Sequence, residues 1–199
     1  ISFMLLLFLC ATSKAADWYV SSGASGNGTL GNPGSLVTAF AGTGWAASIS
    51  PGDTVWLRGG TYSGVFDCDL SGTTNAPIIF RSYPDERPIL DGGGLYGTQQ
   101  QILRVDTSNV WFWGIEVMSS DTDRWASTSG SQPTASEMPR PNGVELMQGA
   151  VLSGVKFINM LVRDTRQAIS IWTNSYNVEV YGCTLINNGW EAPDRGHGH

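Results

Sequence analysis

Short apolar runs of period two, separated by turn residues, dominate the second half of the chain. Three segments share one pattern: two alternating apolar residues, then glycine or asparagine, then two more alternating apolar residues. They are "SNVWFWGIEVMSS" (108–120), "SGVKFINMLVRDT" (153–165) and "YNVEVYGCTLINN" (176–188). This alternation is typical of strands with one buried face, and it does not fit the 3.6-residue period of a helix. Glycine and asparagine tolerate positive φ, so each segment predicts two strands joined at a sharp corner.

Aligning the three segments on Val110, Val155 and Val178 places equivalent residues in columns. The predicted inward columns are Phe112, Phe157 and Val180, then Ile115, Met160 and Cys183, then Val117, Val162 and Leu185, with Gly114, Asn159 and Gly182 at the corner. Because each short strand pair cannot bury its own apolar face, stacking of successive turns is needed to form a core.

An upstream series extends the repeat. "TVWLRGG", "PIIFRSY" and "QILRVDT" begin at residues 54, 77 and 101, and "NGVELM" (142–147) and "QAISIW" (167–172) continue the series. We therefore predict an all-β fold, a right-handed parallel β-helix, because parallel crossovers are almost always right-handed. A β-sandwich is the alternative, since its strands also recur at short intervals. The polar segment 120–141 is predicted to be a loop inserted into one turn.

The first 50 residues have a different character. The stretch "FMLLLFLCATSKAA" (3–16) is apolar and then rich in small residues, which indicates an incomplete signal peptide over 1–16 that is cleaved after Ala15 or Ala16. A short buried helix is the alternative for this stretch. Residues 17–50, with a short helix capped by Ser35, are predicted to cover the open end of the β-helix. Residues 51–199 are the predicted turns, truncated at the C-terminus.

Composition and charge exclude several classes of function. Removal of 1–16 takes away Lys14 and brings the formal net charge from −6 to −7, so clustered cations for nucleic acid are lacking. The apolar run is too short to span a membrane. Cys68 and Cys183 are placed several turns apart, beyond disulfide reach, and are predicted to be free thiols. We expect a secreted or periplasmic monomer.

Three longer segments resemble a known family. "WYVSSGASGNGTLGNPGSL", "ISPGDTVWLRGGTYSG" and "APIIFRSYPDERPILDGGG" are similar to the opening of secreted pectin-lyase-like β-helix proteins, and the resemblance covers nearly all of 17–199 except the insertion. It implies a right-handed parallel β-helix, secretion and an association with polysaccharides. It does not imply one activity, because this fold carries several chemistries.

Outward positions supply the candidate site. Arg58, Arg81 and Arg104 recur at intervals of 23 residues and are predicted to form one column, which would suit the carboxylates of an acidic polysaccharide. A solvated column neutralised by nearby carboxylates is the alternative. Trp56 and Trp111, with Trp113 and Tyr181, are candidates for stacking on sugar rings. Asp106 and Glu145 are candidate Ca²⁺ ligands, and His197 and His199 are weaker candidates for a metal.

Other charged residues have simpler expected roles. Lys156 is predicted to lie between Trp111 and Glu179 and to pair with the latter. Asp67 and Asp69 are candidates for a hydrolase pair, for turn residues or for calcium ligands. Arg163, Asp164 and Arg166 follow the third repeat at a corner and are predicted to pair locally. Gly196–Gly198 resembles part of a polygalacturonase motif, but Asn187 and Asn188 stand where its aspartates are expected.

These features favour a carbohydrate-active protein. The leading interpretation is a polysaccharide lyase on an acidic polysaccharide, with Arg81 and Arg104 as candidate catalytic residues, since β-elimination requires the uronate carboxylate to be neutralised. The alternatives are a non-catalytic polysaccharide-binding or surface protein, and a glycoside hydrolase of the same fold, which would need an acid and a base carboxylate.

Overall fold

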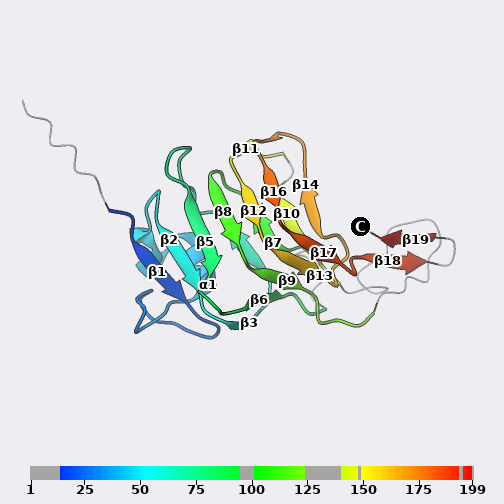
Figure 1. Ribbon diagram of the computed structural model, residues 1–199, viewed down its shortest axis with the longest axis horizontal. Coiled ribbons are helices and arrows are strands. Elements are labelled where there is room, and N and C mark those ends of the chain that lie inside the picture. Colours follow the sequence, from blue (N-terminus) through cyan, green and yellow to red (C-terminus); the bar gives the residue numbers. More distant parts are fainter. Residues whose placement is uncertain (1–13, 95–100, 124–139, 148, 193–194, 199) are drawn as a thin grey trace, which may run out of the picture.

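The computed structural model describes residues 14–94, 101–123, 140–147, 149–192 and 195–198. Three parallel sheets run along the molecule, and successive strands of the chain pass from one sheet to the next (Figure 1). Sheet 1 contains β1 (Asp17–Val20), β2 (Thr54–Leu57), β5 (Ile78–Ser82), β8 (Val110–Trp113), β12 (Lys156–Ile158) and β16 (Glu179–Tyr181). Sheet 2 contains β3 (Gly60–Ser63), β6 (Pro88–Asp91), β9 (Glu116–Met118), β13 (Leu161–Arg163) and β17 (Thr184–Ile186). Sheet 3 contains β4 (Phe66–Cys68), β7 (Gln101–Val105), β10 (Asn142–Leu146) and β14 (Ile169–Ile171).

Strand pairing decides between the two predicted architectures. Within the three sheets, every described pair of neighbouring strands is parallel, and non-consecutive strands lie side by side. A β-sandwich built from hairpins would show antiparallel pairs. The right-handed parallel β-helix is confirmed. Two small pairs accompany it: β11 (Leu152–Ser153) with β15 (Ser175–Tyr176), and the antiparallel β18 (Gly189–Ala192) with β19 (Arg195–Gly198).

The corner between sheets 1 and 2 has the predicted backbone. Gly114, Asn159 and Gly182 have φ of 70°, 50° and 63°, a left-handed conformation that glycine and asparagine adopt most readily. A Cβ atom on Gly182 would lie 2.2 Å from Oδ1 of Asn159, so the asparagine of one turn covers the glycine of the next. Glycine at this position therefore suits both the left-handed conformation and the close approach of the Asn159 side chain.

The upstream part of the predicted register is wrong. Val55 pairs with Phe80 and Phe80 with Phe112, whereas the segments beginning at 101, 142 and 167 belong to sheet 3. The interval between equivalent residues therefore changes from turn to turn. The cause is that the connecting segments differ in length, so a near-constant spacing of 23 residues links strands of two different sheets.

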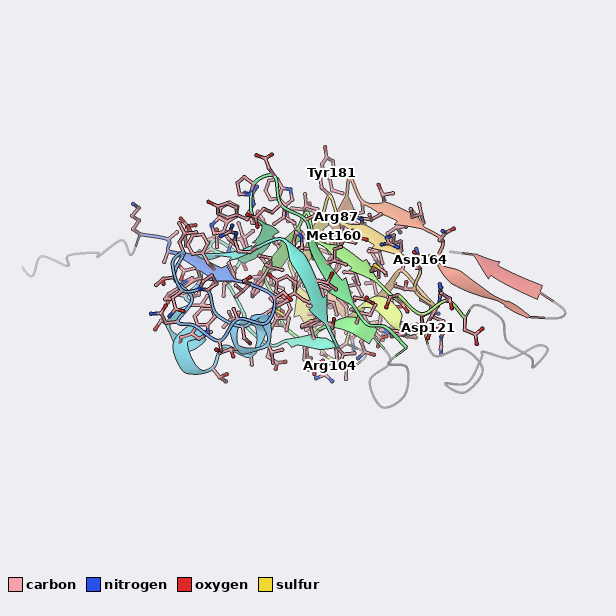
Figure 2. The ribbon with its side chains drawn as sticks, turned by 90° about the horizontal axis from the view of Figure 1, so that it is seen from below. Arg87, Arg104, Asp121, Met160, Asp164 and Tyr181 are labelled. Carbon is pink, nitrogen blue, oxygen red and sulfur yellow. The ribbon has the colours of Figure 1, made fainter. Side chains whose placement is uncertain are left out.

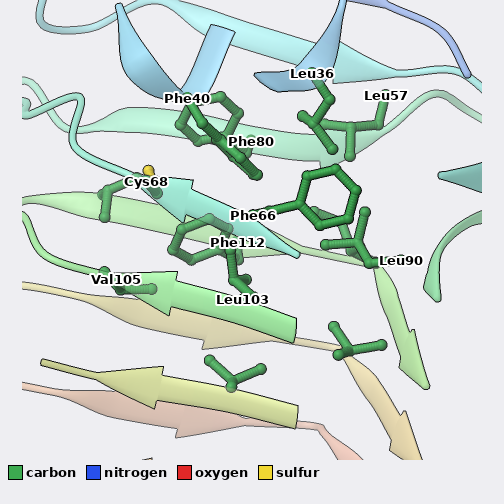
Figure 3. Close-up of a cluster of buried hydrophobic side chains, with 14 of the residues drawn as sticks. Leu36, Phe40, Leu57, Phe66, Cys68, Phe80, Leu90, Leu103, Val105 and Phe112 are labelled. Carbon is green, nitrogen blue, oxygen red and sulfur yellow. The ribbon is translucent and has the colours of Figure 1, made fainter. Parts of the chain in front are cut away.

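Phenylalanine side chains form the centre of the core (Figure 3). Phe80, Phe112 and Phe157 are fully buried and stack on one another, with ring centroids 5.8 and 5.7 Å apart and planes within 17° of parallel. Each ring comes from the same inward position of successive sheet-1 strands, so the strand spacing sets the ring spacing. Phe40 covers the Phe80 end of the stack edge-on, with the centroids 4.7 Å apart.

The N-terminal region both extends and covers the β-helix. β1 is the first strand of sheet 1 and pairs in parallel with β2. The predicted helix is present as α1 (Leu36–Ala41), and Oγ of Ser35 accepts a hydrogen bond from the amide of Thr38 at 3.2 Å. A short 3₁₀ helix, η1 (Gly44–Ser48), follows. α1 buries Phe40 against the sheets, so this region covers the apolar end of the first turn.

The cysteines and the last turn complete the description. Cys68 is buried and Cys183 half-buried, and both are free thiols as predicted. Desolvation raises the pKa of the Cys68 thiol, so it stays protonated. Val180 and Leu185 occupy inward columns but are 47% and 41% exposed, because β16 and β17 are the last strands of their sheets. No helix in the described part is long and apolar enough to cross a membrane.

Candidate functional site

The predicted column of three arginines is not formed. Arg81 lies in β5 of sheet 1, opposite Trp56 and not opposite Arg58, which follows β2 by one position. Arg104 lies in β7 of sheet 3, on another side of the β-helix. Figure 2 shows Arg104 on the opposite side of the molecule from Tyr181, an outward residue of sheet 1. The equal spacing in the sequence therefore does not bring these side chains together.

Arg58 is held by a carboxylate. Its Nε lies 2.9 Å from both carboxylate oxygens of Glu86, and Nη2 lies 2.6 Å from Oε1. The amide of Gly59 donates a further hydrogen bond to Oε2 at 2.6 Å. The hydrogen bonds from Arg58 and then from Gly59 lower the pKa of Glu86, while Arg58 stacks on Tyr83 at 4.6 Å from the ring centroid. Arg58 therefore ties the turn after β5 to β2.

This pair predicts a small pH dependence of stability. Because Glu86 has a lower pKa in the folded chain, its contribution is fully present above the unfolded pKa of about 4.3 and is lost as the pH falls through the folded value. Glu86→Gln should lower the free energy of unfolding by less than about 1 kcal/mol at pH 7, since both side chains are partly exposed. Urea unfolding from pH 7 to 3 should show the difference shrinking. A difference independent of pH would contradict the role given to this pair.

Arg81 is held differently, between two indoles. Its guanidinium carbon lies 4.7 Å from the ring centroid of Trp56 and 4.2 Å from that of Trp113, which are its neighbours on β2 and β8. Within the described residues, no carboxylate lies within ion-pair distance of Arg81, and its buried Nε has no hydrogen-bond partner. A cation stacked on aromatic rings and lacking a carboxylate is well placed to bind an anion.

The tryptophans present less ring surface than the sequence suggested. Trp56 and Trp113 each have a face covered by Arg81, and Trp111 has a face covered by Lys156, whose Nζ lies 4.7 Å from its ring centroid. Nε1 of Trp56 donates to Oδ1 of Asp17 at 2.7 Å. The cause is that side chains of successive turns stack along the axis of the β-helix. The rings therefore hold cations in place on the outer face of sheet 1.

The predicted pairing of Lys156 is confirmed. Lys156 lies in register between Trp111 and Glu179, and its Nζ is 2.9 Å from Oε1 of Glu179. The exposure of Glu179 and of Tyr181, which is 70% exposed, agrees with the outward positions predicted for them. The outer face of sheet 1 thus contains one neutralised cation, Lys156, and one cation without a carboxylate, Arg81.

Sheet 3 carries a row of mainly acidic character. Asp67, Arg104, Glu145 and Ser170 are in cross-strand register on β4, β7, β10 and β14. Nε of Arg104 lies 3.2 Å from Oδ1 of Asp67, and Nη2 lies 3.7 Å from Oδ2 of Asp106. Glu145 accepts a hydrogen bond from Nδ2 of Asn142 at 3.4 Å. Asp67 and Asp106 lie within ion-pair distance of Arg104, and Glu145 is its neighbour in register, so this part of sheet 3 has a negative formal charge.

The carboxylates of the row provide only part of a calcium site. Their oxygens are the ligands that Ca²⁺ prefers, but Ca²⁺ takes six to eight of them. Within the described residues, no three His, Cys, Asp or Glu side chains gather around one point. A guanidinium rather than an open space faces Asp106. Within the described residues, these carboxylates alone therefore supply fewer ligands than Ca²⁺ takes.

The remaining candidates have local roles or lie outside the described part. Nη1 of Arg163 is 2.6 Å from Oδ2 of Asp164, as predicted for this corner, and Arg166 is buried. Asp69 is exposed, and its amide donates to the carbonyl of Phe40 at 3.1 Å. The side chain of His197 and the whole of His199 lie outside the described residues.

Two features were missed from the sequence. Glu116, which is buried, pairs with Arg87 and with Arg163, and its outward position between Ile115 and Val117 gave no signal of this burial. Asn109 and Asn177 line a hollow beside Trp111 and Lys156. Their signal was the Asn that stands directly before the first apolar residue of two repeats.

Known proteins are similar to this chain in sequence or in fold. No family model matches the chain. Pectate lyase PEL9 of Emericella nidulans is 31% identical over 121 residues, which cover 53% of this chain and 28% of the relative. The solved pectate lyase Pel9A superposes with a TM-score of 0.60 at 20% identity, over 86% of this chain and 39% of that one. This chain has the pectin-lyase-like fold.

Other solved structures share this pectin-lyase-like fold. A rhamnogalacturonan lyase has a TM-score of 0.61 at 14% identity and covers 86% of this chain and 51% of its own. The GH136 lacto-N-biosidase from Eubacterium ramulus has a TM-score of 0.61 at 16% identity, over 87% of this chain and 34% of its own. These identities establish the fold alone, which lyases and a glycosidase share. The chain spans 28% of the length of its curated relative.

Proposed function

We propose that this protein is a secreted carbohydrate-active protein, a polysaccharide lyase that acts on an acidic polysaccharide. The similarity to a pectate lyase supports the class of substrate. The observation that carries the proposal is Arg81, a guanidinium held between Trp56 and Trp113 with no carboxylate beside it in the described part of the chain. Binding a uronate carboxylate would supply the partner that this cation lacks.

The chemistry of β-elimination explains why such a cation matters. A base removes the proton on the carbon next to the uronate carboxylate, a carbon–carbon double bond forms, and the bond to the leaving glycosidic oxygen breaks. Negative charge develops on the carboxylate as the proton leaves, so a positioned cation stabilises the transition state more than the ground state. We assign this role to Arg81. Its position between two indoles fixes the guanidinium before substrate binds.

Arg104 is the less suitable of the two candidate arginines. Asp67 and Asp106 already neutralise it, and Glu145 adds a further negative charge to the same row. A polyuronate approaching sheet 3 would meet this negative charge, whereas at sheet 1 it would meet Arg81. Calcium dependence stays a prediction. A substrate bound on sheet 3 would require a cation between its carboxylate, Asp106 and Glu145, whereas a substrate bound at Arg81 would not.

Retention on immobilised polygalacturonate tests the proposal. Arg81→Gln should weaken retention by roughly tenfold or more, because a charge-assisted hydrogen bond contributes about 1.5–3 kcal/mol. Arg104→Gln is the matched control and should leave retention within about twofold, since Asp67 and Asp106 already neutralise Arg104. Thermal unfolding of each variant establishes that both are folded. The reverse pattern would place the anion site on sheet 3, and unchanged retention of both variants would refute an arginine-based site.

A non-catalytic binding protein is the second candidate. Carboxylates on the outer face of sheet 1 already have partners, Asp17 with Trp56 and Glu179 with Lys156, which favours binding over proton transfer at this face. The two functions differ in their products. Incubation with polygalacturonate or alginate, with and without Ca²⁺, should yield the ultraviolet absorbance of unsaturated uronate if the protein is a lyase. Retention without that absorbance would favour binding alone.

A further inference from the structure

A hollow of about 320 Å³ lies on the outer side of the β-helix, where connections from sheet 3 enter sheet 1. Its volume is at the lower end of the range for small-molecule sites. The residues come from four successive turns, just before or within β5, β8, β12 and β16, so the stacking of the turns builds the walls. Those that carry the argument are Asn109, Trp111, Ser153, Lys156, Asn177 and Glu179.

Neutral polar groups line the corner side of the hollow. Asn109 and Asn177 have φ of 55° and 51°, a conformation that asparagine tolerates and that recurs at this corner of the β-helix. Nδ2 of Asn177 donates a hydrogen bond to Oγ of Ser153 at 3.3 Å. The side-chain carbonyl oxygen and the second N–H of Asn177 take no part in that bond. Amides and a hydroxyl together offer both donors and acceptors, which is what a hydroxyl-bearing ligand requires.

The charged groups of the hollow balance one another. Nζ of Lys156 lies 2.9 Å from Oε1 of Glu179 and 4.7 Å from the ring centroid of Trp111. The ammonium has three donors and the carboxylate has several acceptor positions, so both keep capacity for a ligand after pairing. Because the pair carries no net charge, an anionic ligand would have to compete with Glu179 for Lys156. An uncharged ligand meets no such competition.

We propose that this hollow binds an uncharged sugar residue of a polysaccharide, at a subsite separate from Arg81. Glu179 accepts hydrogen bonds from ring hydroxyls, and Asn177 can both accept from and donate to them. Lys156 donates to a further hydroxyl, and the exposed part of Trp111 supplies an apolar wall. The choice of a glycan as ligand rests on the proposed function, whereas the preference for an uncharged residue rests on the paired charges alone. Arg81 and the hollow would then bind different sugar residues of one heteropolysaccharide.

Affinity electrophoresis in gels containing galactan, arabinan, xylan or polygalacturonate tests the proposal. The unaltered protein should be retarded by at least one of the three neutral glycans. Glu179→Ala and Asn177→Ala should each weaken that retardation about tenfold, the loss expected when a ligand hydrogen bond is removed and its partner is left unpaired. Thr184→Ala, an exposed residue of the same turn that lies in β17 on sheet 2, is the matched control and should leave it unchanged.

The outcomes separate this proposal from the proposed function. Absence of retardation by all three neutral glycans, or an equal loss in the Thr184 variant, would overturn the uncharged-sugar subsite. Retardation by polygalacturonate alone that disappears in Lys156→Met would also overturn it, because the hollow would then bind an anion. Arg81→Gln should leave retardation by the neutral glycan unchanged. If a neutral glycan retards the protein and polygalacturonate does not, the proposed acidic substrate is refuted, whereas the uncharged-sugar subsite is supported.

Discussion

Phe112→Ala is expected to lower the free energy of unfolding by about 3–5 kcal/mol, the range found when a buried phenylalanine is truncated to alanine. Phe112 is fully buried and stacks on a ring at each side, Phe80 at 5.8 Å and Phe157 at 5.7 Å between centroids. Its removal therefore exposes two ring faces to one cavity. Strands of a parallel sheet cannot close this gap, because backbone hydrogen bonds hold them at their spacing.

Chemical denaturation monitored by far-ultraviolet circular dichroism measures this effect. Val180→Ala is the matched control, since Val180 occupies the same inward column but is 47% exposed. We expect the control to lose less than about 1 kcal/mol, because little apolar surface leaves a buried environment. Equal losses in the two variants would mean that the ring stack contributes no more than a side chain in the last turn.

Glu116→Gln is expected to lower the free energy of unfolding by about 1.5–3 kcal/mol, because a buried carboxylate loses its charge-assisted hydrogen bonds, while Arg163 keeps Asp164 and Arg87 is largely exposed to water. The Glu116 side chain is 2% exposed. It pairs with Arg87 on one side, and on the other its Oε1 lies 2.6 Å from Nε of Arg163. The two arginines come from different turns, so the carboxylate links three successive turns on sheet 2.

Glu179→Gln provides the comparison for this variant. It makes the same chemical change in an ion pair whose glutamate is 59% exposed, and it should cost less than about 1 kcal/mol. Urea unfolding at pH 7 measures both variants. A loss below 1 kcal/mol in Glu116→Gln would show that solvent reaches this carboxylate more easily than its burial indicates.

Much of the fold was accessible from the sequence because local alternation and corner residues agree. Val110, Val155 and Val178 gave the correct register for the last three turns, because the two strands and the corner between them have the same length in each of these repeats. The same reasoning failed upstream, where Arg104 was aligned with Arg81. Equal spacing in the chain measures distance along the backbone, whereas the stacking of turns depends on loop lengths, which vary between Phe80 and Phe112 and between Phe112 and Phe157.

The candidate site was less accessible for the same reason. The pairing of Lys156 with Glu179 followed from register alone, since both lie in the well-aligned turns. The position of Arg81 between Trp56 and Trp113 needed the correct register between β2, β5 and β8. The partners of Glu116 come from residues far apart in the sequence, and alternation carries no information about which charges will meet.

The stacking of turns also determines how the molecule can open. Each turn contacts only the turn before it and the turn after it, so a fluctuation that frees one strand is felt first by its two neighbours. α1 shields the first turn with Phe40, and the rings of Phe80, Phe112 and Phe157 continue the buried stack through the next turns. Freeing β5, β8 or β12 therefore exposes a buried ring, whereas freeing a segment that connects two sheets does not. Backbone amides of these three strands should exchange hydrogen with solvent more slowly than those of the connecting segments.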